Sequence, residues 1–170
     1  MKKQYLTSRY NTGFTIIELL VVISVIAVLS TVIFASIRNA RIKNADAAAK
    51  QSLQGVPPQS ELFYVDNSYS YAGVCQLGIV GATGVKSVGE LVAGAAKAEN
   101  ILTYGVNNTP PASLSNVTCN NTDSAWAVEV PMMDKDIGGS GASAMFCVDS
   151  MGNVGYRSQS IGNTAVCPAS

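Results

Sequence analysis

A long run without charged side chains near the N-terminus constrains this chain more than any other feature. Nineteen consecutive residues, Leu19–Ile37, carry no charge, and the apolar stretch begins at Phe14. As a helix at about 1.5 Å per residue, Phe14–Ile37 is about 36 Å long, enough to cross a hydrocarbon core of about 30 Å. The stretch contains one ionisable residue, Glu18. Because a charge is costly inside a membrane, Glu18 is a candidate functional residue.

Two ordinary interpretations of this N-terminus are a secretory signal peptide and a plain single-span anchor. Lys2, Lys3 and Arg9 make its start basic, and Ile33-Phe34-Ala35 loosely fits a small-residue cleavage site. A secretory apolar region is usually about 7–15 residues long, whereas this one is longer and has an acid near its start. A plain anchor accounts for the length and the basic start but gives Glu18 no role.

A basic leader ends at Gly13, and Phe14-Thr15-Ile16-Ile17-Glu18-Leu19-Leu20 follows it. This order of residues resembles the N-terminus of type IV pilins and pseudopilins. In that family, a prepilin peptidase cuts after the glycine on the cytoplasmic side and N-methylates the new N-terminal residue. The resemblance implies a cut between Gly13 and Phe14, methylation of Phe14, and a role for Phe14 and Glu18 in filament assembly. The resemblance is close over residues 12–38, whereas after Ala48 it is limited to the general architecture.

There is a physical reason for this order of leader, cut and apolar run. Because the apolar run lies after the expected cut, the mature protein keeps it and must bury it after leaving the membrane. Packing against copies of itself in a helical filament core is one solution, since heterologous contacts that do not close generate filaments. Glu18 then has a partner in the α-amine of Phe14 on a neighbouring subunit, at the cost of desolvating both charges. Glu18 also suits the dipole of the mature helix, and both roles are compatible.

Length and charge limit what the rest of the chain can do. The 170 residues leave room for one globular domain of roughly 110 residues beyond a leader and a long helix. Formal net charge is zero, and removing the three basic leader residues leaves a mildly acidic mature chain. No strong basic field for nucleic acid is therefore present. The expected organisation is a leader at 1–13, a transmembrane or filament-core helix at 14–37, an amphipathic helical continuation at 38–65 and a globular domain at 66–170.

The residues that carry most enzyme chemistry are missing or badly spaced. Histidine is absent, which removes the commonest general base and the commonest metal ligand. No glycine-rich phosphate loop follows an expected strand, and Asp134-Lys135-Asp136 with Gly138 lacks the ligand number of an EF-hand calcium loop. We therefore expect no enzymatic activity, no cofactor and no metal.

Four cysteines lie beyond the apolar run, at Cys75, Cys119, Cys147 and Cys167. None forms a Cys-x-x-Cys pair, which disfavours a structural zinc site. An even set in an exported domain indicates two disulfides, with three possible connectivities. We favour Cys75–Cys119 and Cys147–Cys167, because sequential pairing suits a meander-like sheet and one bridge would fix the C-terminus.

Local signals predict how the helical part ends. Good helix formers from Ile37 to Gln54 indicate that the helix continues past the apolar run. Gly55 and Pro57-Pro58 predict a kink or short break, followed by helix to about Tyr64. Farther along, Ser87 and Glu90 have the spacing of a capping box, which predicts a short helix over 88–98.

The remainder predicts antiparallel strands separated by turns. The strongest candidate is 124–130, where Trp126, Val128 and Val130 alternate with other residues and indicate one core-facing side. Further candidate strands are 101–106, 116–119, 144–148 and 154–157, with a turn at Gly138–Gly141 and a hairpin tip at Gly152. The expected fold class is α+β: a long N-terminal helix packed on a C-terminal antiparallel sheet, as in pilins.

These features together predict a structural subunit of a type IV pilus-like filament. The resemblance implies that its partners are copies of itself, a prepilin peptidase and inner-membrane assembly machinery. It also implies a single-pass precursor in the inner (cytoplasmic) membrane with a cytoplasmic N-terminus, and then an extracellular pilus. One alternative is a pseudopilin of a type II secretion or DNA-uptake system, in a periplasmic pseudopilus. An alternative of another class is a monomeric, membrane-anchored extracytoplasmic binding domain.

Overall fold

The structure is a computed structural model that describes residues 13–168, with gaps at 82, 108, 114 and 135–143. Outside the described residues lie the expected leader apart from Gly13, residues 135–138 of the segment compared with a calcium loop, and the turn at Gly138–Gly141. The chain divides into two compact units, Met1–Asn39 and Ala40–Ser170. Each unit is described by itself.

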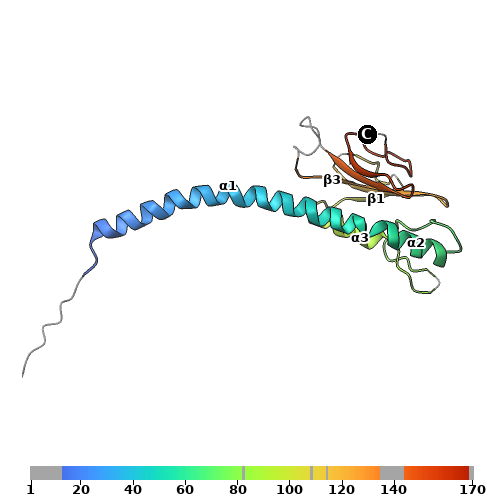
Figure 1. Cartoon of the computed structure of the whole chain (residues 1–170), viewed down its shortest axis with the longest axis horizontal. Helices are drawn as coiled ribbons and strands as arrows, with labels where there is room; N and C mark the ends of the chain where they lie inside the picture. Colours follow the sequence, from blue (N-terminus) through green and yellow to red (C-terminus); the bar gives the residue numbers. More distant parts are fainter. Residues whose placement is uncertain (1–12, 82, 108, 114, 135–143, 169–170) are drawn as a thin grey trace, which may run out of the picture. The chain divides into compact units, whose positions relative to one another are not determined.

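The first unit consists of the start of one long helix. Helix α1 spans Ile16–Gln54, and its first part belongs to this unit (Figure 1). The large apolar side chains described here are between 41% and 80% exposed. Ser24, Ser30 and Thr31 donate their hydroxyl hydrogens to backbone carbonyls one turn earlier. Their polar groups are thus satisfied within the helix, as an apolar environment requires.

The second unit begins with the rest of α1 and continues through a break into helix α2, Val56–Asp66. Gly55 forms the turn between them, and the two prolines occupy the first turn of α2, where a missing backbone donor costs little. This confirms the predicted break. Across both helices, Ala49, Leu53 and Phe63 face the interior and are fully buried.

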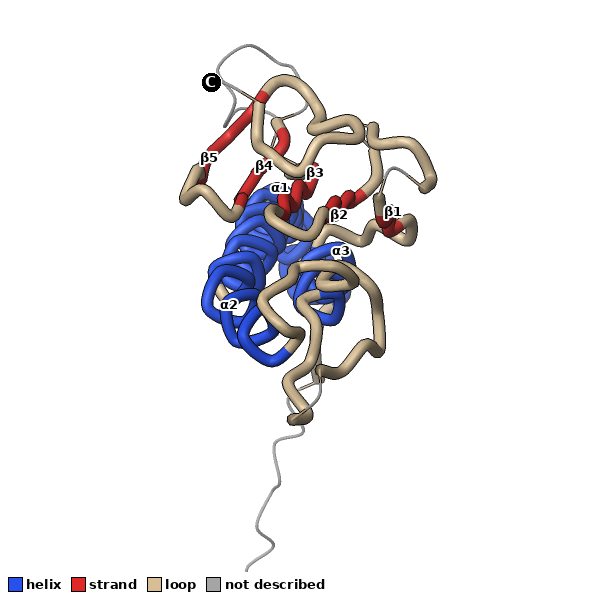
Figure 2. Tube along the Cα trace, turned by 90° about the vertical axis from the view of Figure 1, so that its right-hand side faces the viewer, coloured by secondary structure: helices blue, strands red, loops and turns tan. Residues whose placement is uncertain are grey.

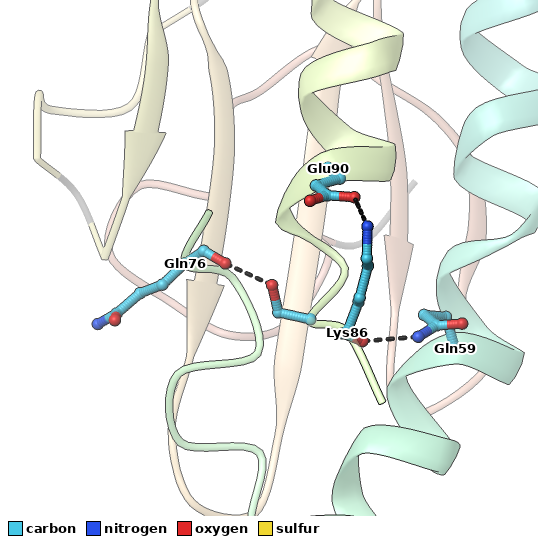
Figure 3. A network of polar contacts seen from close by, with 5 residues as sticks. Gln59, Gln76, Lys86 and Glu90 are labelled. Carbon is cyan, nitrogen blue, oxygen red and sulfur yellow. Dashed lines mark hydrogen bonds and ion pairs between the residues drawn. The ribbon is translucent and has the colours of Figure 1, made fainter. Parts of the chain in front are cut away.

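The loop before helix α3, Gly89–Ala98, is fastened by side chains instead of by a helix cap. The Ser87 hydroxyl donates to the Gln76 carbonyl, and α3 has no side-chain hydrogen bond at its N-cap. Gln59 Nε2 donates to the Lys86 carbonyl at 2.6 Å, and Lys86 Nζ lies 3.3 Å from Glu90 Oε2 (Figure 3). The predicted capping box of Ser87 and Glu90 is therefore wrong, because a tertiary acceptor takes the serine and a neighbouring lysine takes the glutamate.

Within the described residues, five strands form one sheet in the order β1-β2-β3-β4-β5; Figure 2 shows them side by side. Their bounds are β1 Tyr104–Val106, β2 Val117–Asn121, β3 Trp126–Pro131, β4 Met145–Asp149 and β5 Val154–Arg157. The pairs from β2 to β5 are antiparallel, as predicted, and Gly152 has φ +85° in the β4–β5 hairpin. β1 instead pairs with β2 in parallel, because the intervening loop carries the chain back before β2 begins.

The α+β fold class is confirmed: in the second unit, the later part of the long N-terminal helix packs on a mostly antiparallel sheet. Trp126, Val128 and Phe146 on the sheet share one buried cluster with Leu53 of α1 and Phe63 of α2. Within the second unit, α2 and α3 lie on the same side of the sheet (Figure 2). The predicted core-facing side of β3 is thus the side that meets the helices.

Two disulfides tie loops to this sheet. Cys75–Cys119 joins the loop after α2 to β2, and Cys147–Cys167 joins β4 to the C-terminal segment. These are the pairs that the sequence favours. The described part of the chain has no free cysteine.

Removing either disulfide should weaken the domain measurably. The bridged residues are 44 and 20 positions apart, and restriction of the unfolded chain predicts losses of about 4 and about 3 kcal/mol, respectively. Urea unfolding of Cys→Ala pair variants, compared with the parent protein, measures these losses. Non-reducing peptide mapping must first recover both linked pairs, and four free thiols would contradict an exported domain.

Candidate processing and assembly segment

The segment around the expected cut has a defined local geometry. Gly13, Phe14 and Thr15 are non-helical, and α1 begins at Ile16. Nothing lies within 4 Å of the position that a Cβ on Gly13 would occupy, and the Phe14 side chain is 79% exposed. The Gly13–Phe14 peptide is therefore non-helical and open, which suits a protease substrate.

Thr15 and Glu18 cap the start of α1 reciprocally. The Thr15 backbone N–H donates to Glu18 Oε2 at 2.9 Å, and the Thr15 hydroxyl donates to the same oxygen at 2.7 Å. The Glu18 N–H in turn donates to Thr15 Oγ1 at 3.3 Å. This is a capping box, and it places the carboxylate at the helix end where the dipole favours negative charge.

This cap was not among the predicted features, although its signal is readable in the sequence. Thr15-Ile16-Ile17-Glu18 has the same Ser/Thr-x-x-Glu spacing that was assigned to Ser87 and Glu90. Glu18 therefore has a structural role in the isolated chain before any neighbour is considered. A role in assembly would have to use the remaining lone pairs of its carboxylate.

Beyond the cap, α1 offers an extended apolar surface. Among the described residues, one helical run is long and apolar enough to cross a membrane; it starts at Ile16, with a mean hydropathy of 2.8 over its most apolar window. None of that window is buried within the described chain. An apolar surface of this extent needs a membrane or a protein partner.

Comparison with known families decides which class of N-terminus this is. Residues 8–34 match the family model of the prokaryotic N-terminal methylation motif. The chain carries the class III signal peptide of type IV pilins and pseudopilins. This pilin-type signal includes Gly13, Phe14 and Glu18, and with the apolar helix it indicates membrane anchoring before assembly. Neither the curated proteins nor the solved structures give a match to this chain.

The globular part of the chain has buried polar residues that the sequence pattern did not predict. On the sheet face away from the helices, the Glu129 carboxylate accepts hydrogen bonds from the Ser160 hydroxyl and from the Ile161 N–H, the latter at 2.8 Å. Asn120 Nδ2 donates to the carbonyls of Gly162 and Thr164 at 2.9 and 2.8 Å. Burial raises the pKa of Glu129. These side chains hold the C-terminal segment on the sheet.

Asp149 completes this attachment at the end of β4. Its Oδ1 accepts the N–H groups of Met151 and Asn153 at 3.0 and 2.9 Å, and its Oδ2 accepts the Cys167 N–H at 2.9 Å. One carboxylate thus organises the hairpin and fixes the residue that forms the disulfide with Cys147. The described residues contain no group of three histidine, cysteine or acidic side chains placed to hold a metal.

Proposed function

We propose that this protein is a structural subunit of a type IV pilus-like filament. A prepilin peptidase cuts between Gly13 and Phe14 and methylates Phe14, and the mature chain then assembles through its N-terminal helix. The observation that carries this proposal is a methylation motif at residues 8–34 followed by an apolar helix that remains with the mature chain and is exposed in the described monomer. Its role is structural, with no catalytic step of its own.

Before assembly, the precursor spans the inner membrane once. Lys2, Lys3 and Arg9 precede the apolar helix, but Arg38, Arg41 and Lys43 follow it, so charge alone does not set the orientation. The methylation motif supports a cytoplasmic N-terminus, because the prepilin peptidase of the resembled family cuts on the cytoplasmic side. The globular domain then lies outside the cytoplasm, where disulfides such as Cys75–Cys119 and Cys147–Cys167 form and persist. Inner-membrane assembly machinery extracts the subunit from this state.

In the filament, Phe14–Ile37 helices pack together. The Glu18 carboxylate accepts a hydrogen bond from the charged α-amine of Phe14 on a neighbouring subunit. Both hydrogen bonds from Thr15 go to Glu18 Oε2, so the carboxylate has lone pairs for a further donor. Cleavage creates that donor, because the Phe14 nitrogen is part of a neutral peptide bond before the cut. Processing and docking are thereby coupled.

Electron microscopy of surface filaments, with mass spectrometry of their subunits, tests the proposal. A strain lacking this gene should lose filaments that contain this protein, and the restored gene should return them. Confinement of the protein to a periplasmic assembly, with a secretion or DNA-uptake defect on deletion, would instead identify a pseudopilin. Recovery of the protein only as a monomer in the membrane would identify an anchored binding domain.

A further inference from the structure

Two acidic side chains are buried together in the second unit, away from the processing segment. Asp46 on α1 is 2% exposed, and Glu99, the residue after α3, is 3% exposed. The Asp46 carboxylate accepts the Met133 N–H at Oδ1, 2.9 Å away, and the Asp134 N–H at Oδ2, 3.2 Å away. Asp46 therefore ties α1 to the chain that leaves β3.

The Glu99 carboxyl has a different environment. Both of its oxygens are buried, and among the described residues neither has a partner with full hydrogen-bond geometry. The Met133 N–H, which donates to Asp46 Oδ1, is shared with Glu99 and favours its ionised form. The Asp46 side chain, itself buried, interacts with this carboxyl. Two ionised carboxylates cannot hydrogen-bond to each other, whereas a protonated and an ionised carboxyl can share one proton. Because two amide N–H groups already stabilise the charge on Asp46, the proton belongs on Glu99.

The other charged groups around the pair do not remove this need for a proton. Lys50, one turn farther along α1, favours the ionised form of Glu99, but its Nζ lies over the ring of Tyr156, 4.9 Å from the centroid. Lys97 on α3 is exposed to water. Asp134 contributes a negatively charged side chain as well as the backbone N–H that donates to Asp46. Burial, followed by the hydrogen bond and charge of Asp46, raises the pKa of Glu99 to about 8, against the Lys50 charge and the Met133 N–H.

We propose that Asp46 and Glu99 share one proton in the folded protein, and that this proton is a pH-sensitive latch between α1 and the end of α3. In acid the shared proton holds Asp46 and Glu99 together, and this contact is lost when the proton leaves. The unfolded chain gives up the Glu99 proton near its ordinary pKa of 4.5, whereas the folded chain keeps it to about 8. The latch therefore contributes its full stability below about pH 4.5 and loses it as pH rises to about 8. Over this range the unfolding equilibrium constant rises by at most about tenfold per pH unit.

Infrared spectroscopy of the full-length processed protein in detergent tests the shared proton directly. At pH 6.5, the wild type should show the carbonyl stretch of a protonated carboxylic acid that is missing from Glu99→Gln. Comparison with this variant isolates the signal from that of Glu129, which is unchanged in both. Asp46→Asn should shift the titration of this signal to lower pH, because it removes the negative charge that faces Glu99. Identical wild-type and Glu99→Gln spectra would overturn the proposal.

Urea unfolding across pH tests the latch itself. The Gln side-chain N–H donates to Asp46 as protonated Glu99 does, so Glu99→Gln should match the wild type at pH 4.5. As pH rises, Glu99→Gln should become more stable than the wild type. The ratio of the wild-type to the variant unfolding equilibrium constant should grow by up to about tenfold per pH unit and level off above pH 8. Glu90→Gln, which removes an exposed carboxylate paired with Lys86, is the matched control and should show no such growth.

Two results would contradict the latch. One is a difference between wild type and Glu99→Gln that does not vary from pH 4.5 to pH 9. The other is loss of the wild-type acid signal on adding calcium at pH 6.5, which would mean that the carboxyl pair holds a cation instead of a proton. Parallel samples with a chelator provide the reference for this second result.

Discussion

Glu18→Gln is expected to abolish filaments or to reduce their number by about tenfold or more, with processing and membrane level unchanged. The glutamine carbonyl can still accept the N–H and hydroxyl hydrogens of Thr15, so the start of α1 survives. What disappears is the negative charge that the α-amine of Phe14 needs when a new subunit docks. Insertion of the precursor should be no worse, since a carboxylate in a membrane segment is unfavourable.

Counting filaments by electron microscopy, with immunoblots of the membrane fraction, measures this effect. Glu90→Gln removes an exposed carboxylate from the globular domain and should give wild-type filaments. Thr15→Ser keeps the hydroxyl cap and should do the same. Normal filament number in Glu18→Gln would show that Glu18 only caps its own helix, and the anchored-monomer alternative would gain if no filament contained the protein.

Gly13→Leu is expected to block cleavage and to leave the full precursor in the membrane. The chain has open space at this position, with no atom within 4 Å of a Cβ on Gly13. The substitution therefore leaves the fold intact, and any block arises where the side chain meets the peptidase. Without the cut, the Phe14 nitrogen remains a peptide nitrogen, so methylation and docking should fail together.

The mobility of the protein on gels, checked by intact mass, follows the cut in cells that contain the peptidase. Gly13→Ala adds a single methyl group and is the matched variant; it should be cut more slowly than the wild type but faster than Gly13→Leu. Full cleavage of Gly13→Leu at the Gly13–Phe14 bond would mean that the peptidase does not require glycine there. The site assignment would then rest on Phe14 alone.

Features decided by local chemistry were predictable from the sequence. The break between α1 and α2 follows from Gly55 and two prolines, and the β4–β5 hairpin follows from Gly152 at its tip. The two Ser/Thr-x-x-Glu segments show the limit of such signals. Thr15 and Glu18 cap the start of α1, whereas Ser87 donates to the Gln76 carbonyl and Glu90 pairs with Lys86. Spacing alone cannot separate these two outcomes.

Features decided by distant parts of the chain were not predictable. Alternation in β3 predicts that Trp126, Val128 and Val130 face the core, but it gives no reason to bury Glu129 on the other face. That burial depends on the C-terminal segment, where Ile161 supplies its N–H from 32 positions away. The parallel pairing of β1 and the contact between Asp46 and Glu99 likewise depend on the path of the whole chain.

The most direct test of the central claim is the N-terminal mass of this protein in sheared, purified filaments. We expect a mature chain that begins at Phe14 and carries one added methyl group on its α-amine. We also expect both disulfides to be present in the same preparation. An N-terminus at Met1, or at Ser36 after removal of the apolar helix as a secretory signal, would contradict the claim.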